Sequence, residues 1–314
     1  MVAGLAMAIV ATAQSPAEKR PALSPASVAQ LAETGHCREA LPLLKAEWAH
    51  ATGAALEKRL GADGVQCAMA LGDADSAEDF VRALKTRFPR DPEVLYISVH
   101  VFSDLSVRAS RELSLTAPGS YQMHELNAEA MEAQGKPDEA IEEYREVLKK
   151  QPNVHGIHYR MGRLLLSDPN RSPEKKDQAR REFEAELKSD PASAASEYVL
   201  GEMARQDQQS DAAIGHFERA SKLDSGFTDA FIGLGRALIE GGRVANALAP
   251  LQTAARLEPN NPAPHLYLAT AYRQLGRVED AQRESEQQRE ASEKLRMARE
   301  RQRAQEAGIA GENK

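Results

Sequence analysis

The sequence has few of the residues on which many functional sites depend. Its 314 residues include two cysteines and one tryptophan, and aromatic residues make up only 5%. No Cys-x-x-Cys spacing occurs, so we expect neither a structural zinc site nor a dithiol redox centre. A basic excess is missing too, because 40 Lys and Arg face 47 Asp and Glu and give a net charge of −7. Binding to phosphate backbones needs clustered positive charge, so we expect no nucleic-acid partner.

Long apolar runs are confined to the N-terminus, where residues 1–13 carry no charge. Thirteen residues are too few to cross about 30 Å of hydrocarbon as a helix, and no later segment is apolar enough, so we expect no stable membrane insertion. The run and its small residues at 11–13 fit a secretory signal peptide, although no basic residue precedes them. We expect cleavage after Ala13, a spacer at 14–24, and a periplasmic or secreted protein. The alternative is a cytoplasmic protein with an Ala-rich N-terminus.

Residues of three kinds recur with a period of 34, which lengthens once to 39. The first series of small residues comprises Ala128, Gly162, Gly201, Gly235 and Ala269. The second comprises Ala140, Ala179, Ala213, Ala247 and Ala281. A bulky series takes the same steps through Tyr144, Phe183, Phe217 and Leu251. Such a period predicts a repeat protein whose units cover one another's apolar faces.

These repeats resemble the tetratricopeptide repeat (TPR) family over residues 121–295, and the unit 228–261 carries the family pattern most completely. The resemblance implies an all-α superhelical solenoid of antiparallel helical hairpins. We expect about eight hairpins and a long C-terminal capping helix at 277–305. The chain then divides into divergent helical repeats at 25–120, TPR-like repeats at 121–295, and a charged helix end and tail at 296–314.

The same arrangement follows from the sizes of the residues. Gly201 and Gly235 are small where two helices of a hairpin cross, and a larger side chain there would cost roughly 1–3 kcal/mol by overpacking. Gly242 and Gly276 fit the short turn inside a hairpin, where a left-handed residue commonly ends a helix. The single step of 39 places five extra residues in one such turn, around 167–173.

The N-terminal third fits the repeat less closely. We predict hairpins from 25–33 with 36–49 and from 55–71 with 76–87, followed by a shortened one from 92–102 with 105–115. Ser24 and Pro25 mark a helix start, as N-cap and first helical residue. The stretch 94–101 is β-branched and has strand propensity, but a lone strand would have no partner in a helical stack, so we expect a helix there.

The two cysteines, Cys37 and Cys67, fall opposite each other if 37–50 and 55–71 are antiparallel helices joined near residue 52. In an oxidising compartment we predict a disulfide between them, stabilising the fold by about 3 kcal/mol. The alternative is a pair of buried, reduced thiols, which is common for free cysteine.

Motifs for catalysis are missing, with neither a phosphate-binding glycine loop nor a Gly-x-Ser-x-Gly turn. His124, His158 and His265 share one repeat position, and we interpret them as packing residues within hairpins. His155 lies three residues before His158, but no third metal ligand is evident. We therefore expect no enzyme activity, no metal and no cofactor.

Binding to another protein is the function that the resemblance implies, because the first helices of TPR hairpins line a concave groove. The residues expected there are Tyr159, Arg163, Tyr198, Glu202, Arg205, Arg236, Tyr267 and Arg273. Tyrosine and arginine are favoured in binding hot spots, and several arginines suggest an acidic or carboxylate-bearing peptide. The alternatives are that these side chains only face solvent, or that the protein is an accessory subunit that binds a polysaccharide or other polymer in the cell envelope.

Overall fold

The computed structural model describes residues 24–168 and 172–312, with side chains up to residue 304. The predicted signal peptide at 1–13, its cleavage after Ala13 and nearly all of the spacer lie outside the described residues. Within these residues the secondary structure consists of fifteen α-helices and the turns between them. They fall into two compact units, which divide between Thr116 and Ala117; unit 1 is the N-terminal one and unit 2 the C-terminal one. The all-α class of antiparallel hairpins is therefore confirmed.

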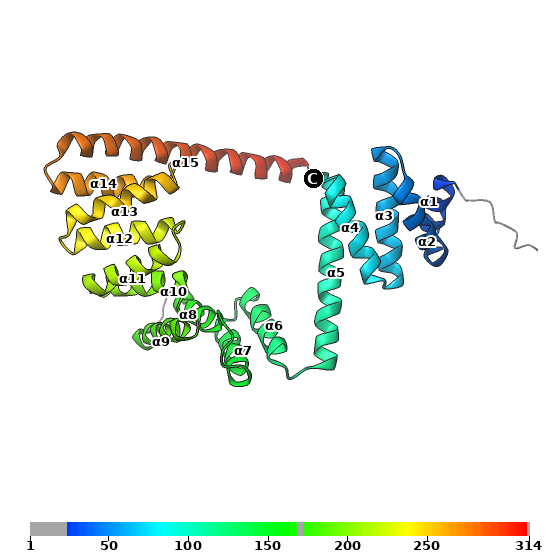
Figure 1. Cartoon of the computed structure of the whole chain (residues 1–314), viewed down its shortest axis with the longest axis horizontal. Coiled ribbons are helices and arrows are strands. Elements are labelled where there is room, and N and C mark those ends of the chain that lie inside the picture. The colour runs from blue at the N-terminus through cyan, green and yellow to red at the C-terminus, as the bar shows by residue number, and fades with distance from the viewer. Residues whose placement is uncertain (1–23, 169–171, 313–314) are drawn as a thin grey trace, which may run out of the picture. The chain divides into compact units, whose positions relative to one another are not determined.

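Unit 1 contains five helices, of which the first four form two hairpins (Figure 1). Their bounds are α1 Pro25–Glu33, α2 Cys37–His50, α3 Ala54–Leu71, α4 Ala74–Arg87 and α5 Pro92–Thr116. Ser24 caps α1, because its hydroxyl accepts the Ser27 N–H. Leu44, Leu60 and Leu84 are fully buried between α2, α3 and α4. The first two predicted hairpins are thus present, with ends within two residues of the prediction.

Cys37 and Cys67 form a disulfide in unit 1. Cys37 is the first residue of α2 and Cys67 lies in the last part of α3. The two helices pack against each other as antiparallel neighbours, and the two Cα atoms lie 4.8 Å apart. Both residues are buried, so the bond is inside the core of the unit.

The prediction of a third hairpin in this region, 92–102 with 105–115, is wrong. The structure has one continuous helix, α5, of 25 residues. Residues 103 and 104 were expected to turn, but neither is glycine or proline, and Asp104 instead pairs with Arg108 one turn later along the helix. Within the described residues the chain therefore has seven hairpins and one single helix, where about eight hairpins were expected.

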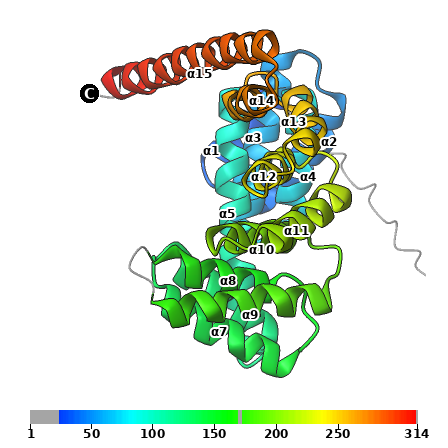
Figure 2. The same ribbon diagram turned by 90° about the vertical axis from the view of Figure 1, so that its left-hand side faces the viewer.

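Unit 2 contains ten helices in five consecutive hairpins, which stack on one another (Figure 2). Their bounds are α6 Tyr121–Ala133, α7 Pro137–Lys150, α8 Ile157–Ser167, α9 Pro173–Ser189, α10 Ala194–Gln206, α11 Ser210–Leu223, α12 Thr228–Glu240, α13 Val244–Leu257, α14 Pro262–Gln274 and α15 Val278–Glu312. The first half of α15 closes the last hairpin against α14, and the helix then continues to 35 residues. This is the long C-terminal helix that the sequence predicts.

Close helix crossings explain the small residues of the repeat, and all ten members of the two small series are buried. A Cβ atom on Gly162 would lie 2.7 Å from the Phe183 ring, and one on Gly201 would lie 2.8 Å from the Phe217 ring. The Phe217 ring also lies close to the next hairpin, because a Cβ on Gly233 would lie 2.6 Å from it. Phe217 therefore fills the space between its own hairpin and the following one.

The turns inside the hairpins use left-handed backbone at one position. Gly242 and Gly276 have φ values of 76° and 72°, as their place in the repeat predicts. The corresponding residue in the α10–α11 turn is Gln208, which adopts a φ of 60° despite its side chain. Such a conformation costs a residue with a Cβ roughly 1–2 kcal/mol.

No helix among the described residues is both long enough and apolar enough to span a membrane.

Candidate functional site

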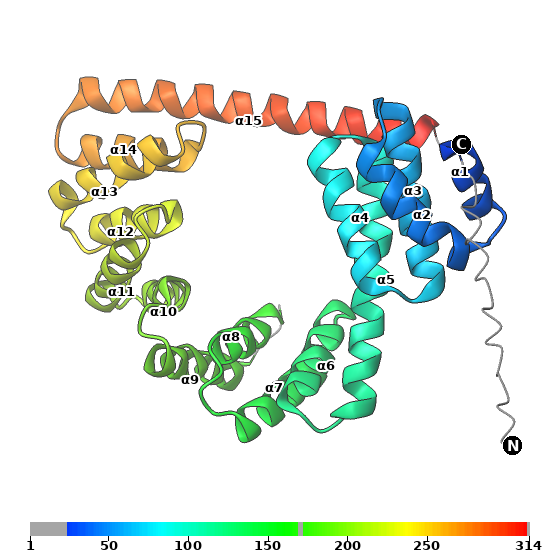
Figure 3. The same ribbon diagram turned by 45° about the vertical axis from the view of Figure 1, so that its right-hand side comes forward.

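The first helices of the hairpins line one side of unit 2. Figure 3 shows α8, α10 and α12 on the inner side of the curve that this unit makes, with α9, α11 and α13 on its outer side. The residues predicted to bind a partner lie on α8, α10, α12 and α14. We refer to the part of this side formed by α10, α12 and α14 as the inner surface.

Five of the predicted residues and one that was not predicted form a cluster on the inner surface. This inner cluster comprises Tyr198, Glu202, Arg205, Arg236, Glu240 and Tyr267. Arg205 Nη2 lies 3.0 Å from Glu202 Oε2, within α10. Glu240 of α12 connects the two arginines, with its Oε1 3.0 Å from Arg236 Nε and 3.5 Å from Arg205 Nη1. The cluster therefore spans two successive hairpins through charged contacts.

Each of the two tyrosines of the cluster packs against a neighbouring side chain. The Tyr198 ring packs against the rings of Phe217 and Phe227, at centroid distances of 5.7 and 5.0 Å. The Arg236 guanidinium lies 5.9 Å from the centre of the Tyr267 ring, which extends the cluster to α14. Burial raises the pKa of Tyr198 from its ordinary value of 10.0 to about 12.

The arginines of the cluster already have acidic partners. The hydrogen bond to Glu202 raises the pKa of the Arg205 guanidinium, although partial burial opposes the rise, and only 14% of the side chain is exposed. The sequence suggested arginines available to an acidic ligand, but it did not identify Glu240. Glu240 lies at the end of α12, one turn after Arg236 on the same helix, and this i, i+4 spacing is the signal that could have identified it.

Tyr159 and Arg163 belong to a different group of contacts. Arg163 Nη2 lies 3.8 Å from Glu132 Oε1 of α6, and the Tyr159 ring packs on Phe183 of α9 at 5.7 Å. The side-chain partners that the structure gives them therefore lie on α6 and α9. These two residues are not brought together with the inner cluster.

Arg273 also lies apart from the cluster. Its Nε donates to the Ala269 carbonyl at 3.0 Å, and its side chain lines a hollow of about 490 Å³ against α15. Ser285 of α15 lines this hollow at the repeat position that Leu251 and Phe217 fill in earlier hairpins. The small serine explains why space remains there.

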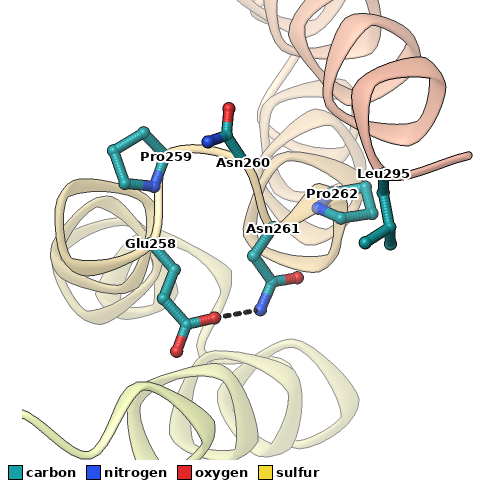
Figure 4. Close-up of a pocket in the computed structure, with 6 residues that line it drawn as sticks. All are labelled: Glu258, Pro259, Asn260, Asn261, Pro262 and Leu295. Atoms are coloured by element: carbon teal, nitrogen blue, oxygen red, sulfur yellow. Dashed lines mark hydrogen bonds between the residues drawn. The ribbon is translucent and has the colours of Figure 1, made fainter. Parts of the chain in front are cut away.

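A second hollow of unit 2, of about 450 Å³, lies at the turn between α13 and α14 (Figure 4). Pro259, Pro262 and Leu295 give it an apolar lining, and Asn261 Nδ2 donates to Glu258 Oε2 at 2.9 Å across the turn. Neither arginine of the inner cluster lines it.

The histidines that share a repeat position bridge the two helices of their own hairpins. His124, His158 and His265 each place Nδ1 2.7 Å from a glutamate oxygen, on Glu143, Glu182 and Glu284 respectively. The glutamate follows 19 residues after the histidine, or 24 in the hairpin with the longer turn. The interpretation of these residues as structural therefore agrees with the contacts that they make.

The α10–α11 hairpin has the same bridge with the residue types exchanged. Glu197 on the first helix lies 2.6 Å from His216 Nδ1 on the second, and Arg219 Nε lies 2.6 Å from its other oxygen. Burial favours a higher pKa for Glu197. The hydrogen bonds from Arg219 and His216 outweigh this effect, so the pKa of Glu197 lies below its ordinary value. No group of three or more His, Cys, Asp and Glu in the described chain is arranged to hold a metal ion.

Comparison with known families decides the identity of the repeats. Three family models, each described as tetratricopeptide repeat, match residues 128–164, 174–226 and 238–298. The chain is a tetratricopeptide repeat protein. The matched segments fall within unit 2, where the 34-residue period is clearest.

Solved TPR structures show the same fold. YrrB, described as a TPR protein with an unusual peptide-binding site, has a TM-score of 0.51 at 16% identity and covers 62% of this chain and 98% of its own. A crystal structure of MamA has a TM-score of 0.50 at 22% identity and covers 55% of this chain and 92% of its own. At these identities the likeness concerns the fold alone. No curated protein matches the sequence.

Proposed function

We propose that the protein is a non-catalytic scaffold that binds a peptide or helix of a partner protein on the inner surface of unit 2. Membership of the TPR family supports the general role, since TPR proteins typically mediate protein–protein interaction. The inner cluster supports the location, because it combines two tyrosines and two arginines from three successive hairpins. Residues of these types combine apolar area with directed hydrogen bonds and dominate binding hot spots.

The proposed ligand carries a carboxylate. Arg205 and Arg236 are the basic residues of the cluster, and a guanidinium binds a carboxylate with two parallel hydrogen bonds. The peptide-binding site described for YrrB is a property of that protein, but it shows that a chain with this fold can bind a peptide.

The experiment compares partner recovery by three forms of the protein. Wild type, Arg205→Glu with Arg236→Glu, and a control with Arg181→Glu and Arg256→Glu are used to recover cross-linked partners from an envelope extract. The control makes the same change of charge at exposed positions on the outer helices α9 and α13. We expect a specific protein to be lost with the inner variant only. Equal recovery by all three forms would contradict the proposed site, and unchanged protein recovery with lost polysaccharide binding would favour a polymer-binding role.

We further propose that the protein works in an oxidising compartment, such as the periplasm or the cell exterior. The disulfide between Cys37 and Cys67 supports this, because structural disulfides are rare in reducing compartments. Rapid alkylation of intact cells, followed by peptide mass mapping, tests the proposal. Two alkylated thiols would contradict it.

A further inference from the structure

The carboxylate of Glu240 lies between the two guanidiniums that the proposed function assigns to a ligand. Its Oε1 is 3.0 Å from Arg236 Nε and 3.5 Å from Arg205 Nη1. The Glu240 side chain is 41% exposed, whereas that of Arg205 is 14% exposed, so Glu240 is the member of the contact that solvent and ligands reach more readily.

The repeat itself does not require an acidic residue at this position. The corresponding residues in the other first helices are Ala133, Ser167, Gln206 and Gln274. Four of the five hairpins of unit 2 therefore form and stack without a carboxylate there. The charge of Glu240 consequently calls for an explanation other than hairpin packing.

Both arginines are held in place by contacts that do not involve Glu240. Glu202 binds Arg205 through Nε and Nη2, at 3.3 and 3.0 Å, which leaves Nη1 to Glu240. The Tyr267 ring packs against the guanidinium of Arg236. Removal of the Glu240 carboxylate would therefore leave two oriented guanidiniums, and a preorganised site costs a ligand less ordering entropy.

We propose that Glu240 occupies the position of the ligand carboxylate in the free protein, and that a carboxylate of the partner peptide displaces it. This inference rests on the proposed function, and it makes Glu240 a specificity-determining residue of that site. A neutral peptide can offer the two guanidiniums only uncharged acceptors, so the internal carboxylate disfavours it. An Asp or Glu side chain or a free C-terminus supplies the same chemistry as Glu240, and replaces it as the acidic partner of Arg236 and as the second acidic partner of Arg205.

Direct binding of a defined acidic probe tests the displacement. Fluorescein-labelled acetyl-hexaglutamate amide is titrated with wild type, Glu240→Gln and Glu258→Gln, and fluorescence polarisation is measured. Glu258→Gln is the matched control, because it removes one negative charge from a residue that bonds Asn261 and contacts neither arginine in the structure. If Glu240 contacts the two arginines in about nine-tenths of the molecules, only about one-tenth are free to bind the probe. Removing the Glu240 carboxylate then lowers the apparent dissociation constant about tenfold. The control should bind as wild type does, and adding Arg205→Gln to Glu240→Gln should remove the gain.

Two further probes identify the source of the carboxylate. Hexaglutamine with an amidated C-terminus should bind Glu240→Gln no more tightly than it binds wild type. Hexaglutamine with a free C-terminus should gain affinity for this variant only if a terminal carboxylate is accepted. A gain with hexaglutamate alone would assign the site to acidic side chains.

The results that overturn this inference differ from those that overturn the proposed function. Equal affinity of Glu240→Gln and Glu258→Gln for hexaglutamate, or no binding by either, overturns the inference. A lower urea midpoint of Glu240→Gln without any gain in affinity also overturns the inference. It would mean that the contact only stabilises the packing of α10 against α12. The scaffold function stands in each case if partner recovery still depends on Arg205 and Arg236, and it falls if recovery does not depend on them.

Discussion

The crossing of α10 and α11 gives a direct test of the packing argument, because one hairpin contains two helical glycines in opposite environments. A Cβ on Gly201 of α10 would lie 2.8 and 2.9 Å from two atoms of the Phe217 ring. That ring is fully buried and also lies close to Gly233 of the next hairpin. A Cβ on Gly215 of α11 would meet only the end of the Arg219 side chain, at an ordinary 3.5 Å.

We expect Gly201→Ala to destabilise the protein and Gly215→Ala to stabilise it. Alanine is preferred to glycine inside a helix by about 1 kcal/mol, and both variants gain this amount. Overpacking costs about 1–3 kcal/mol and applies to Gly201 only. The net change is then a loss of up to about 2 kcal/mol for Gly201→Ala and a gain of up to about 1 kcal/mol for Gly215→Ala.

Urea unfolding followed by far-ultraviolet circular dichroism measures both changes. The midpoint should fall for Gly201→Ala and rise for Gly215→Ala, with little change in the slope of the transition, since the same surface is exposed on unfolding. Midpoints that move together, or a stabilised Gly201→Ala, would refute the argument that the small residues mark helix crossings.

Three further predictions concern the disulfide, one turn and one ion pair. Replacing Cys37 and Cys67 by serine should destabilise unit 1 by about 3–4 kcal/mol, since the bond joins residues 30 apart, and hydrogen exchange should show the loss in α1–α4 but not in α11–α13. Gln208→Gly should raise the urea midpoint by relieving about 1 kcal/mol of left-handed strain, and an unchanged or lower midpoint would argue against that strain. The depressed pKa of Glu197 means that its ion pairs stabilise the fold above about pH 4.5, and that this stability is lost as the pH falls through the lower, folded-state pKa. Glu197→Gln should therefore show a smaller stability difference between about pH 6 and about pH 3.5 than wild type does, and an equal difference would contradict the assignment.

Regular spacing made most of unit 2 predictable from the sequence. The 34-residue series of small and bulky residues marks the crossings, and the glycines at 242 and 276 mark the turns, because helix packing and left-handed backbone restrict the residue type directly. The hairpins of unit 1 up to residue 87 were predictable for a similar reason, since helix caps and glycines separate them. Helix α5 was not predictable in this way, because the sequence around 103–104 neither favours nor forbids a turn strongly.

The inner cluster was predictable only in part. The repeat pattern assigns Tyr198, Arg205 and Arg236 to the first helices of their hairpins. Residues at corresponding positions of successive repeats lie on the same face of the stack. It does not reveal that Glu240 lies between the arginines, since that contact joins α10 to α12 and depends on the angle between successive hairpins. Arg273 shares the repeat position of Arg205 but lines a hollow against α15, because the last hairpin has no successor within the described chain.

The histidine–glutamate bridges allow the number of repeats to vary. Both members of each bridge belong to the same hairpin, and the α10–α11 hairpin keeps the bridge with acid and base exchanged. A whole hairpin can therefore be duplicated or deleted without leaving half of such a pair behind. The contact of Glu240 with Arg205 is different, since it joins consecutive hairpins and fixes their order. The bridges thus place no constraint on the length of the stack, whereas the Glu240–Arg205 contact requires that the α10–α11 hairpin is followed by α12–α13.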